Sequence, residues 1–336
     1  MNVNIHQVRL VAFLYNFMKH ISFLFILLIF FFSCSSDQDV TIPDPNLAAA
    51  VRDALGLGPT DPIPLKKLKE LERLDADNKG IKDLTGLEKA TRLKILKLQK
   101  NQISVIKPLT ELTQLVHLEL FENQIDDITP LARSTKLTLL WLDYNHIRDL
   151  TSLTRLTQIT KLGLNGNRIS DLTPLTRLTQ IAILRLRDNH ISDLTPLTDL
   201  TQLSHLILME NNISDLTPLT RLTQLEGLWL DNNQIDDLTP LAGLTQLTEL
   251  GINENQIKNG TPLTDLTQMM RLRLNRNQIS DISFIENFMN LKRLRIRENP
   301  VQDLEPLQKL LKQIPDLELD IQPTEELDIQ PPPAND

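Results

Sequence analysis

The sequence predicts a solenoid, in which short strands and short helical turns alternate along one continuous coil. A phrase of ten residues, DLTPLTRLTQ, stands at 171–180 and returns at 215–224, and near copies are spaced by 22 residues. Apolar residues between the copies alternate with variable ones, as in a strand with one buried face. Aromatic residues make up only 4% of the chain. The core is therefore expected to consist of branched aliphatic side chains in regular positions.

Eleven units of 22 residues run from 71 to 312 without insertion or deletion, and they share the text LxxLxLxxNxIxDLxPLxxLTQ. Leucines at positions 4 and 6 indicate a short strand with one face inward. The Asn at position 9 can satisfy backbone groups where the chain leaves the strand. Thr at position 15 is expected to cap a helical turn, and Pro at position 16 fits its first residue. The spacing of the apolar positions 14, 17 and 20 predicts a 3₁₀ turn.

These residues resemble the leucine-rich repeat, and the form IxDLTPLxxLTQ resembles its internalin type. The resemblance covers 71–312 and implies an α/β solenoid, a right-handed superhelix with parallel strands on its concave face and 3₁₀ turns on its convex side. It also implies a helical N-terminal cap. Residues 44–70 are assigned to that cap, because DPNLAAAVRDAL at 44–55 places apolar residues on one helical face.

The two ends of the chain differ from the repeats. An apolar run at 21–32 follows Lys19 and precedes the junction FFSC, which resembles a bacterial lipobox. Residues 1–33 are therefore predicted to be a lipoprotein signal peptide, Cys34 the lipidated residue, and 34–43 a tether. The alternatives are an ordinary cleaved signal and an uncleaved anchor, and translation starts at Met1 or at Met18.

This reading places the protein outside the cytoplasm, held at the bacterial cell envelope (outer membrane or cell surface) by its N-terminal lipid alone. At the far end, residues 313–321 are expected to finish a C-terminal cap. Residues 322–336, which are acidic and rich in Pro, are predicted to form a disordered tail.

Two units depart from the shared text. Gly260 replaces Leu at position 14, and Ser134 replaces Leu at position 20. Each change removes one apolar side chain from a repeated row. A shallow defect or a local bend is expected at both places.

The variable positions 3, 5 and 7 are expected to point outward onto the concave face. No consensus is apparent at positions 5 and 7, which suggests that the units diverged where a partner could touch them. Both Trp residues of the chain fall on this face, and aromatic side chains are common anchors of protein interfaces. Two patches are predicted to bind a protein partner: Phe121, Leu139, Trp141 and Tyr144 form the first, and Ile183, Ile207, Met209 and Trp229 form the second.

A third patch is basic and lies on the last two repeat strands, with Arg276 beside it. Its members are Arg271, Arg273, Arg293, Arg295 and Arg297. Guanidinium groups suit carboxylate or phosphate ligands, so an acidic region of a partner or an anionic glycan could bind here. The alternative is a solvated face that Glu249, Glu254 and Glu298 partly neutralise.

Several function classes are disfavoured. The histidines are separated by whole coils, and no catalytic arrangement, phosphate loop or metal motif occurs, so no enzyme, cofactor, metal or small-molecule substrate is expected. The single cysteine excludes an intrachain disulfide, and a net charge of −8 argues against nucleic acid. The sequence therefore predicts a non-enzymatic protein–protein recognition module, with a role in adhesion as one form of it. The alternatives are a binder of anionic polysaccharide or another polyanion and a structural spacer.

Overall fold

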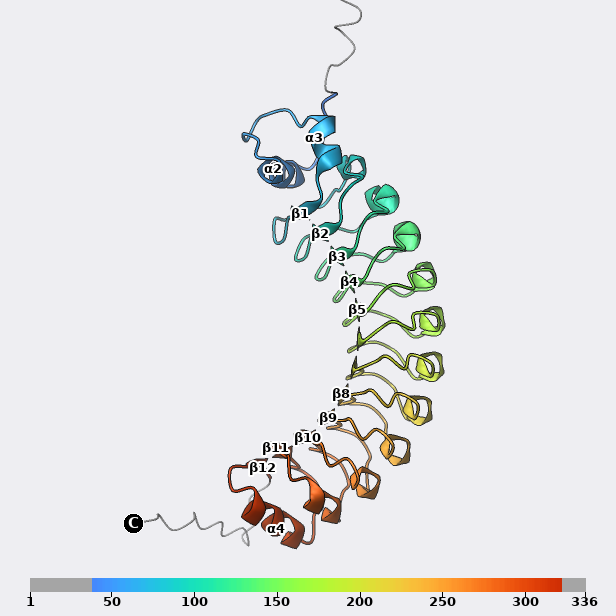
Figure 1. Cartoon of the computed structure of the whole chain (residues 1–336), viewed down its shortest axis with the longest axis vertical. Coiled ribbons are helices and arrows are strands. Elements are labelled where there is room, and N and C mark those ends of the chain that lie inside the picture. The colour runs from blue at the N-terminus through green and yellow to red at the C-terminus, as the bar shows by residue number, and fades with distance from the viewer. Residues whose placement is uncertain (1–37, 322–336) are drawn as a thin grey trace, which may run out of the picture.

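The computed structural model of the chain describes residues 38–321, which form one curved solenoid (Figure 1). Strands line the inner side of the curve, and short helices line the outer side (Figure 1). Within the described residues the sheet has twelve strands in sequence order, and neighbouring strands pair in parallel. The predicted signal peptide, Cys34 and the predicted tail at 322–336 lie outside the described residues.

Each strand of the described part has three residues and occupies positions 3 to 5 of its unit, apart from the last. The strands are β1 (Arg73–Asp75), β2 (Ile95–Lys97), β3 (His117–Glu119), β4 (Leu139–Trp141), β5 (Lys161–Gly163), β6 (Ile183–Arg185), β7 (His205–Ile207), β8 (Gly227–Trp229), β9 (Glu249–Gly251), β10 (Arg271–Arg273), β11 (Arg293–Arg295) and β12 (Glu318–Asp320).

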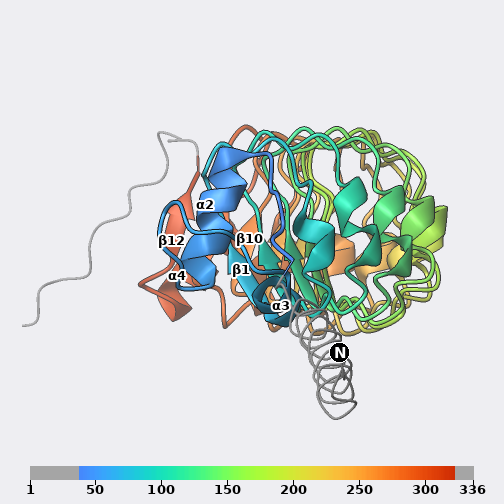
Figure 2. The ribbon, with the colours of Figure 1, turned by 90° about the horizontal axis from the view of Figure 1, so that it is seen from above.

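The helices of the described part are of two kinds. The α-helices stand at the ends of the solenoid and are α2 (Pro45–Ala54), α3 (Leu65–Glu70) and α4 (Glu305–Gln313). The 3₁₀ turns lie on the convex side and are η1 (Leu87–Lys89), η2 (Lys107–Glu111), η3 (Thr129–Arg133), η4 (Thr151–Leu153), η5 (Thr173–Leu175), η6 (Thr195–Leu197), η7 (Thr217–Leu219), η8 (Thr239–Leu241), η9 (Thr261–Leu263) and η10 (Ser283–Asn287). Figure 2 looks along the solenoid and shows these turns on the side away from β1 and β10. The predicted fold class is confirmed.

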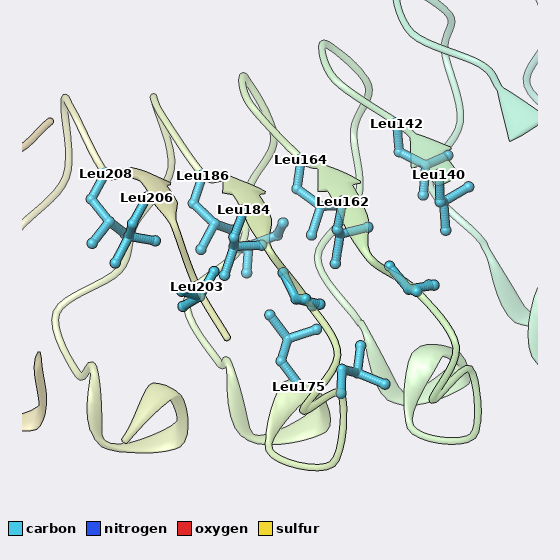
Figure 3. Close-up of a cluster of buried hydrophobic side chains, with 14 of the residues drawn as sticks. Leu140, Leu142, Leu162, Leu164, Leu175, Leu184, Leu186, Leu203, Leu206 and Leu208 are labelled. Atoms are coloured by element: carbon cyan, nitrogen blue, oxygen red, sulfur yellow. The ribbon is translucent and has the colours of Figure 1, made fainter. Parts of the chain in front are cut away.

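The core is a set of parallel leucine rows. Leu162, Leu184 and Leu206 at position 4 are fully buried, as are their position-6 neighbours. Figure 3 shows these side chains pointing into the space between the strands and the 3₁₀ turns, where Leu175 meets them. Burying one such side chain stabilises the fold by about 2 kcal/mol. Because every unit buries the same shape against its neighbours, the sequence can repeat without change here.

The Asn at position 9 forms the predicted ladder. Asn189 Nδ2 donates to the carbonyls of Leu164 at 3.0 Å and Leu186 at 3.1 Å, and its Oδ1 accepts from the Ile169 N–H at 3.0 Å. One side chain thus satisfies backbone groups in two consecutive coils. The same contacts recur from Asn101 to Asn299. Because these backbone groups are buried, the amide cannot be replaced by an apolar residue at low cost.

The expected role of Thr in capping the 3₁₀ turn is wrong. In η5, Thr173 is the first residue of the turn, Pro174 is the second, and the Thr side chain does not cap it. Instead the Asp171 carboxylate at position 13 accepts from the Thr173 N–H at 2.8 Å. Free N–H groups at the start of a helical turn need an acceptor that precedes them, and the shared Asp supplies it.

The two departures from the repeat text behave differently. The defect expected at Gly260 is filled, because a methyl group there would collide with the Phe284 ring, which is 3% exposed. Phe284 stands at position 16 of the next unit, where most units have Pro. At Ser134 the side chain is fully buried, and its hydroxyl has no hydrogen-bond partner. Ser134 therefore remains a weak point of the leucine row.

A cap closes the N-terminal end of the solenoid. The first residue of this cap, Asp44, bonds it to the first repeat. One oxygen of Asp44 accepts from the Asn46 and Leu47 N–H groups of α2, at 2.9 and 3.0 Å. The other accepts from the Lys82 and Asp83 N–H groups of the first unit, at 2.8 and 3.2 Å. A single carboxylate thus caps α2 and holds it on the first coil.

The C-terminal end carries a strand that the repeat text does not predict. After α4, residues Glu318–Asp320 return to the sheet as β12 and pair with β11. Within residues 38–321 no helix is both long enough and apolar enough to cross a membrane.

Candidate binding face

The strand register places positions 3 and 5 of successive units in two rows on the concave face. Trp141 lies between Glu119 and Gly163 in one row, and Ile207 lies beside Trp229 in the same row. The residue between the rows is a buried Leu in each of these strands. Outward projection of these positions follows from the alternation of side chains along a strand.

The first predicted patch is centred on Trp141, which is half-buried. Gly163 of the next strand has no side chain, and a methyl group there would collide with Cε3 of the indole. The ring therefore lies over the backbone of the neighbouring unit. The Arg185 guanidinium, two strands away, lies 4.6 Å from the ring centroid. Such cation–π packing holds the indole in place, and part of the Trp141 surface stays exposed.

Tyr144 extends the first patch beyond the strand. It stands at position 8 with φ of 55°, and its side chain is 48% exposed. The ring lies over Gly166 of the next unit, where a methyl group would collide with Cδ1. Leu139 and Phe121 are half-buried nearby, and no ring–ring contact joins Phe121 to the other two aromatic residues in the described structure. The patch is thus a pair of aromatic platforms flanked by two smaller apolar surfaces.

The second predicted patch forms a hollow of about 380 Å³. Its lining consists of Ile183, Arg185, His205, Ile207, Met209, Trp229 and Arg273. His205 stacks on Trp229 with ring centroids 6.1 Å apart and an angle of 21° between the planes. Gly227 gives the indole its space, since a methyl group there would collide with Cη2. All four predicted members are therefore brought together.

Sequence reasoning missed His205 and Arg185 as parts of this face. The signal was present, because position 3 of β7 is next to Gly227 and one step from Trp229. A Gly among large side chains on an exposed strand indicates that a neighbour lies across it.

The arginine cluster is largely paired within the chain. Arg271 pairs with Glu249 and Arg297 pairs with Asp320. Arg293 lies 2.6 Å from Glu318, and Arg273 reaches across Gly251 to Asp231 at 3.2 Å. Beside them, Arg276 contacts Glu254 and Glu298 at 2.9 and 3.0 Å.

Of the five clustered arginines, Arg295 alone has no ion pair in the described part of the chain. It lines a smaller hollow of about 110 Å³ between Trp229 and the other arginines. Most of the cluster is thus neutralised by acidic residues, as the alternative interpretation expected. Arg295 is the member whose charge is available to a ligand.

Position 7 contains a second polar ladder, which corrects the view that it has no consensus. Its Asp or Asn side chain accepts from the N–H of position 7 in the next unit. Asn165 accepts from Arg187 at 2.8 Å, and Asn253 accepts from Asn275 at 2.8 Å. Asp77, Asp143, Asp231 and Asn275 do the same.

This ladder separates structural from variable residues on the concave face. Phe121 and Met209 stand at position 7 and cannot accept the hydrogen bond, so they interrupt the ladder. Both are members of the predicted apolar patches. Position-7 residues whose side chains do not take part in this ladder are therefore the ones available to contact a partner.

Asp143 is one of two buried acidic groups of this face, and like Asp231 it has 6% of its surface exposed. Burial raises its pKa above the ordinary value, although the Asn165 N–H and the nearby Arg185 act to lower it. Within residues 38–321 no group of three or more His, Cys, Asp or Glu residues is arranged to hold a metal ion. What the face offers is a preformed surface of aromatic, aliphatic and cationic groups, which suits recognition.

Known proteins resemble this chain in sequence and in fold. The family model described as Leucine Rich repeats (2 copies) matches residues 91–133, 201–243, 223–268 and 271–309. An internalin, InlF, from Listeria monocytogenes is 30% identical, with 86% of this chain and 99% of that chain covered and a TM-score of 0.72. The functional domain of InlJ from the same organism includes a cysteine ladder. It is 25% identical, with 85% and 72% covered and a TM-score of 0.65.

A more distant match shows the fold alone. The plant peptide hormone receptor RGFR1, in complex with RGF2, is 24% identical, with 70% of this chain and 42% of that chain covered and a TM-score of 0.61. No curated protein matches the chain.

Proposed function

Because the chain belongs to the internalin family of leucine-rich-repeat proteins, we propose that it binds another protein on its concave face and has no enzymatic activity. The observation that carries this proposal is the arrangement of Trp141 and Trp229, each laid over a glycine of the sheet. Aromatic groups fixed in this way can bind a partner without losing much side-chain freedom. Aromatic and Arg anchors are also the residues that dominate protein interfaces.

The hollow beside Trp229 supports a partner with an apolar anchor. Ile183, Ile207 and Met209 provide aliphatic lining, and Arg185 and Arg273 add positive charge to the same hollow. A projecting apolar side chain flanked by a carboxylate would match this combination. Trp141 and Tyr144 provide a second contact region three to four strands away.

We also propose that the protein is exported and held at the bacterial cell envelope by lipid on Cys34, where adhesion is one use of such a surface. The apolar run at 21–32 and the FFSC junction support this assignment. The test compares the full chain with Cys34→Ala, expressed in a bacterium that processes lipoproteins. The wild-type chain is expected to incorporate labelled palmitate and to stay with the membranes. Equal membrane retention without label in both chains would contradict lipid anchoring.

Binding is tested with residues 35–336 immobilised and exposed to membrane and extracellular fractions. The variant Trp141→Ser with Trp229→Ser is compared with a matched control, Arg155→Ser with Arg177→Ser, on the convex side. Both control residues are exposed. A protein retained by the wild type and the control, and reduced at least about tenfold in the tryptophan variant, is the expected result. Equal retention by all three chains would exclude the aromatic anchors.

Binding of a polyanion through Arg295 and its neighbours is the second candidate function. The Arg295 guanidinium, which has no ion pair within residues 38–321, favours it, whereas the ion pairs of the other cluster members weigh against it. Salt separates the two functions, because polyanion binding weakens steeply with ionic strength and an aromatic interface does so much less. Arg295→Gln should abolish the polyanion interaction and leave the aromatic one. A spacer without a ligand would be insensitive to every concave substitution.

A further inference from the structure

The six residues ELDIQP occur twice near the C-terminus, at 318–323 and again at 326–331. The first copy contains β12, the last strand of the sheet. The second copy lies outside the described residues. The structure thus shows what this hexapeptide does in one place, while the sequence contains the same hexapeptide again eight residues later.

The first copy uses four consecutive residues to join the sheet. The Glu318 N–H donates to the Lys292 carbonyl at 3.0 Å, and the Asp320 carbonyl accepts from the Ile296 N–H at 2.9 Å. The Leu319 and Ile321 side chains, half-buried, pack against the core.

The acidic side chains of the first copy make ion pairs with β11 and the residues that follow it. Glu318 lies 2.6 Å from Arg293, and Asp320 pairs with Arg297. The surface beside β11 is therefore a binding site for a Glu-Leu-Asp-Ile strand. The second copy repeats each of these groups as Glu326, Leu327, Asp328 and Ile329.

Two differences favour the first copy. The first is the length of the connection from Gln313, the end of α4, which is four residues (314–317) to Glu318 and twelve (314–325) to Glu326. Closing a loop three times as long lowers the closure probability about fivefold. The second is the preceding residue, which is the buried Leu317 before the first copy and Glu325 before the second. The second copy is therefore the weaker competitor for the site.

We propose that the two copies of ELDIQP are interchangeable edge strands that compete for one site beside β11. When 326–329 occupy the site, the first copy is released into a longer loop. The C-terminal end of the solenoid then stays closed when either segment is withdrawn, for example by another protein that binds an acidic strand. This inference is independent of any ligand of the concave face.

Amide hydrogen exchange of Ile296 measures occupancy of the site, because its N–H donates to the strand whichever copy is bound. Three variants of the full chain are compared with the wild type. The first-copy variant is Leu319→Asp with Asp320→Lys, the second-copy variant is Leu327→Asp with Asp328→Lys, and the third combines both. Each pair of changes removes the apolar contact and reverses the charge that faces Arg297. The Leu274 amide, which donates to the Arg295 carbonyl at 2.8 Å, reports whether the adjacent strand stays folded.

The second-copy variant should exchange at Ile296 within about twofold of the wild type. The first-copy variant should exchange about a hundredfold faster, since the second copy replaces the first with a longer loop and without the burial of Leu317. The combined variant should exchange at Ile296 at least about tenfold faster than the first-copy variant, while Leu274 keeps its protection. Equal loss in the first-copy and combined variants would overturn the proposal. If Leu274 loses protection as well, the single substitutions Leu319→Ser and Leu327→Ser replace the double ones. Exchange at Ile296 is then compared in the same way among the first-copy, second-copy and combined variants.

Discussion

Among single residues, Asp143 holds a carboxylate that the fold buries and uses as a hydrogen-bond acceptor. Its side chain accepts from the Asn165 N–H at 3.1 Å, a task that Asn performs at the same position in three other units. Asp143→Asn should keep this bond and remove the cost of a buried charge. We expect it to raise the free energy of unfolding by about 0.5–1 kcal/mol at pH 7. Asp143→Ala should lower it by about 1 kcal/mol, because the Asn165 N–H loses its acceptor.

The pH dependence of the stability difference between the wild type and Asp143→Asn tests whether the buried charge causes that difference. Burial raises the folded-state pKa of Asp143 above the unfolded value of about 3.9, so the folded chain binds more protons between the two values. Stability from this group therefore falls as pH rises through that window. Urea unfolding at pH 7 and at a pH below the unfolded value of about 3.9 should show the advantage of Asp143→Asn shrinking at the lower pH. A variant less stable than the wild type at pH 7 would show that the negative charge itself is needed, for instance by Arg185.

Ser152 offers a second change at the scale of one residue. It stands at position 16, where eight units have Pro, and its buried hydroxyl has no hydrogen-bond partner. The turn Thr173–Leu175 shows that Pro fits the same backbone. Ser152→Pro should raise the free energy of unfolding by about 0.5–1 kcal/mol, mainly by restricting the unfolded chain. Thermal unfolding measures this change in stability, and Ser152→Ala is the control that removes only the hydroxyl. A melting temperature below that of the Ala variant would contradict this reasoning.

At the scale of elements, the N-terminal cap depends on the four backbone hydrogen bonds of Asp44. Asp44→Ala should lower the free energy of unfolding by about 2 kcal/mol, because it uncaps α2 and leaves two N–H groups of the first repeat without an acceptor. Hydrogen exchange at the Lys82 amide should accelerate in the variant, while exchange in the central repeats should not. An unchanged Lys82 amide would mean that α2 is held by its apolar face alone.

The same cap should respond to acid. Burial of Asp44 acts to raise its pKa, but the N–H groups of Lys82, Leu47, Asp83 and Asn46 outweigh burial and lower it below the ordinary value. With a depressed folded-state pKa, the contribution of Asp44 is complete above about pH 3.9, the unfolded value. It is lost as pH falls through the lower folded value. The stability difference between wild type and Asp44→Ala should therefore shrink below pH 4, and a constant difference would contradict the role of the ionised group.

Elements also show how far the sequence could predict the structure. The strands, the 3₁₀ turns and the Asn ladder were predictable, because each follows from residues repeated at a fixed position. Position 8 was not, since it has positive φ in every unit although only Gly166 among its residues is Gly. There the conformation is imposed by hydrogen bonds between coils, such as that from the Lys100 N–H to the Phe121 carbonyl at 2.9 Å. Strand β12 was missed because its residues do not resemble the repeat.

The candidate binding face was predictable in its members but not in its contacts. Rows and neighbours follow from the 22-residue spacing, so Ile207, Met209 and Trp229 could be grouped. Which way a long side chain turns depends on space in the neighbouring units. Gly251 allows Arg273 to reach Asp231, and Gly163 allows Trp141 to lie flat. The charges of an arginine cluster cannot be counted as free until such contacts are known.

For the whole molecule, the Asn ladder should decide whether the solenoid unfolds as one unit. Asn211 lies near the middle, where its Oδ1 accepts from the Ile191 N–H at 3.0 Å and its Nδ2 donates to the Leu186 carbonyl at 2.9 Å. Asn211→Ala leaves these buried groups unpaired and should cost about 3 kcal/mol. Within residues 38–321 the backbone of each coil hydrogen-bonds only to the adjacent coils, so the loss falls on the coupling between the two halves. Asn299→Ala, at a half-buried end position, should cost less and leave the halves coupled.

The two tryptophans make this coupling measurable, because Trp141 lies in the N-terminal half and Trp229 follows Asn211. Chains with only one tryptophan, made with Trp141→Phe or Trp229→Phe, report each half by fluorescence during urea unfolding. In the wild type and in Asn299→Ala the two transitions should coincide, as expected for a cooperative repeat array. In Asn211→Ala they should separate, since the free energy that links the halves has been reduced. Coincident transitions in Asn211→Ala, at whatever stability, would show that the leucine rows alone keep the solenoid cooperative.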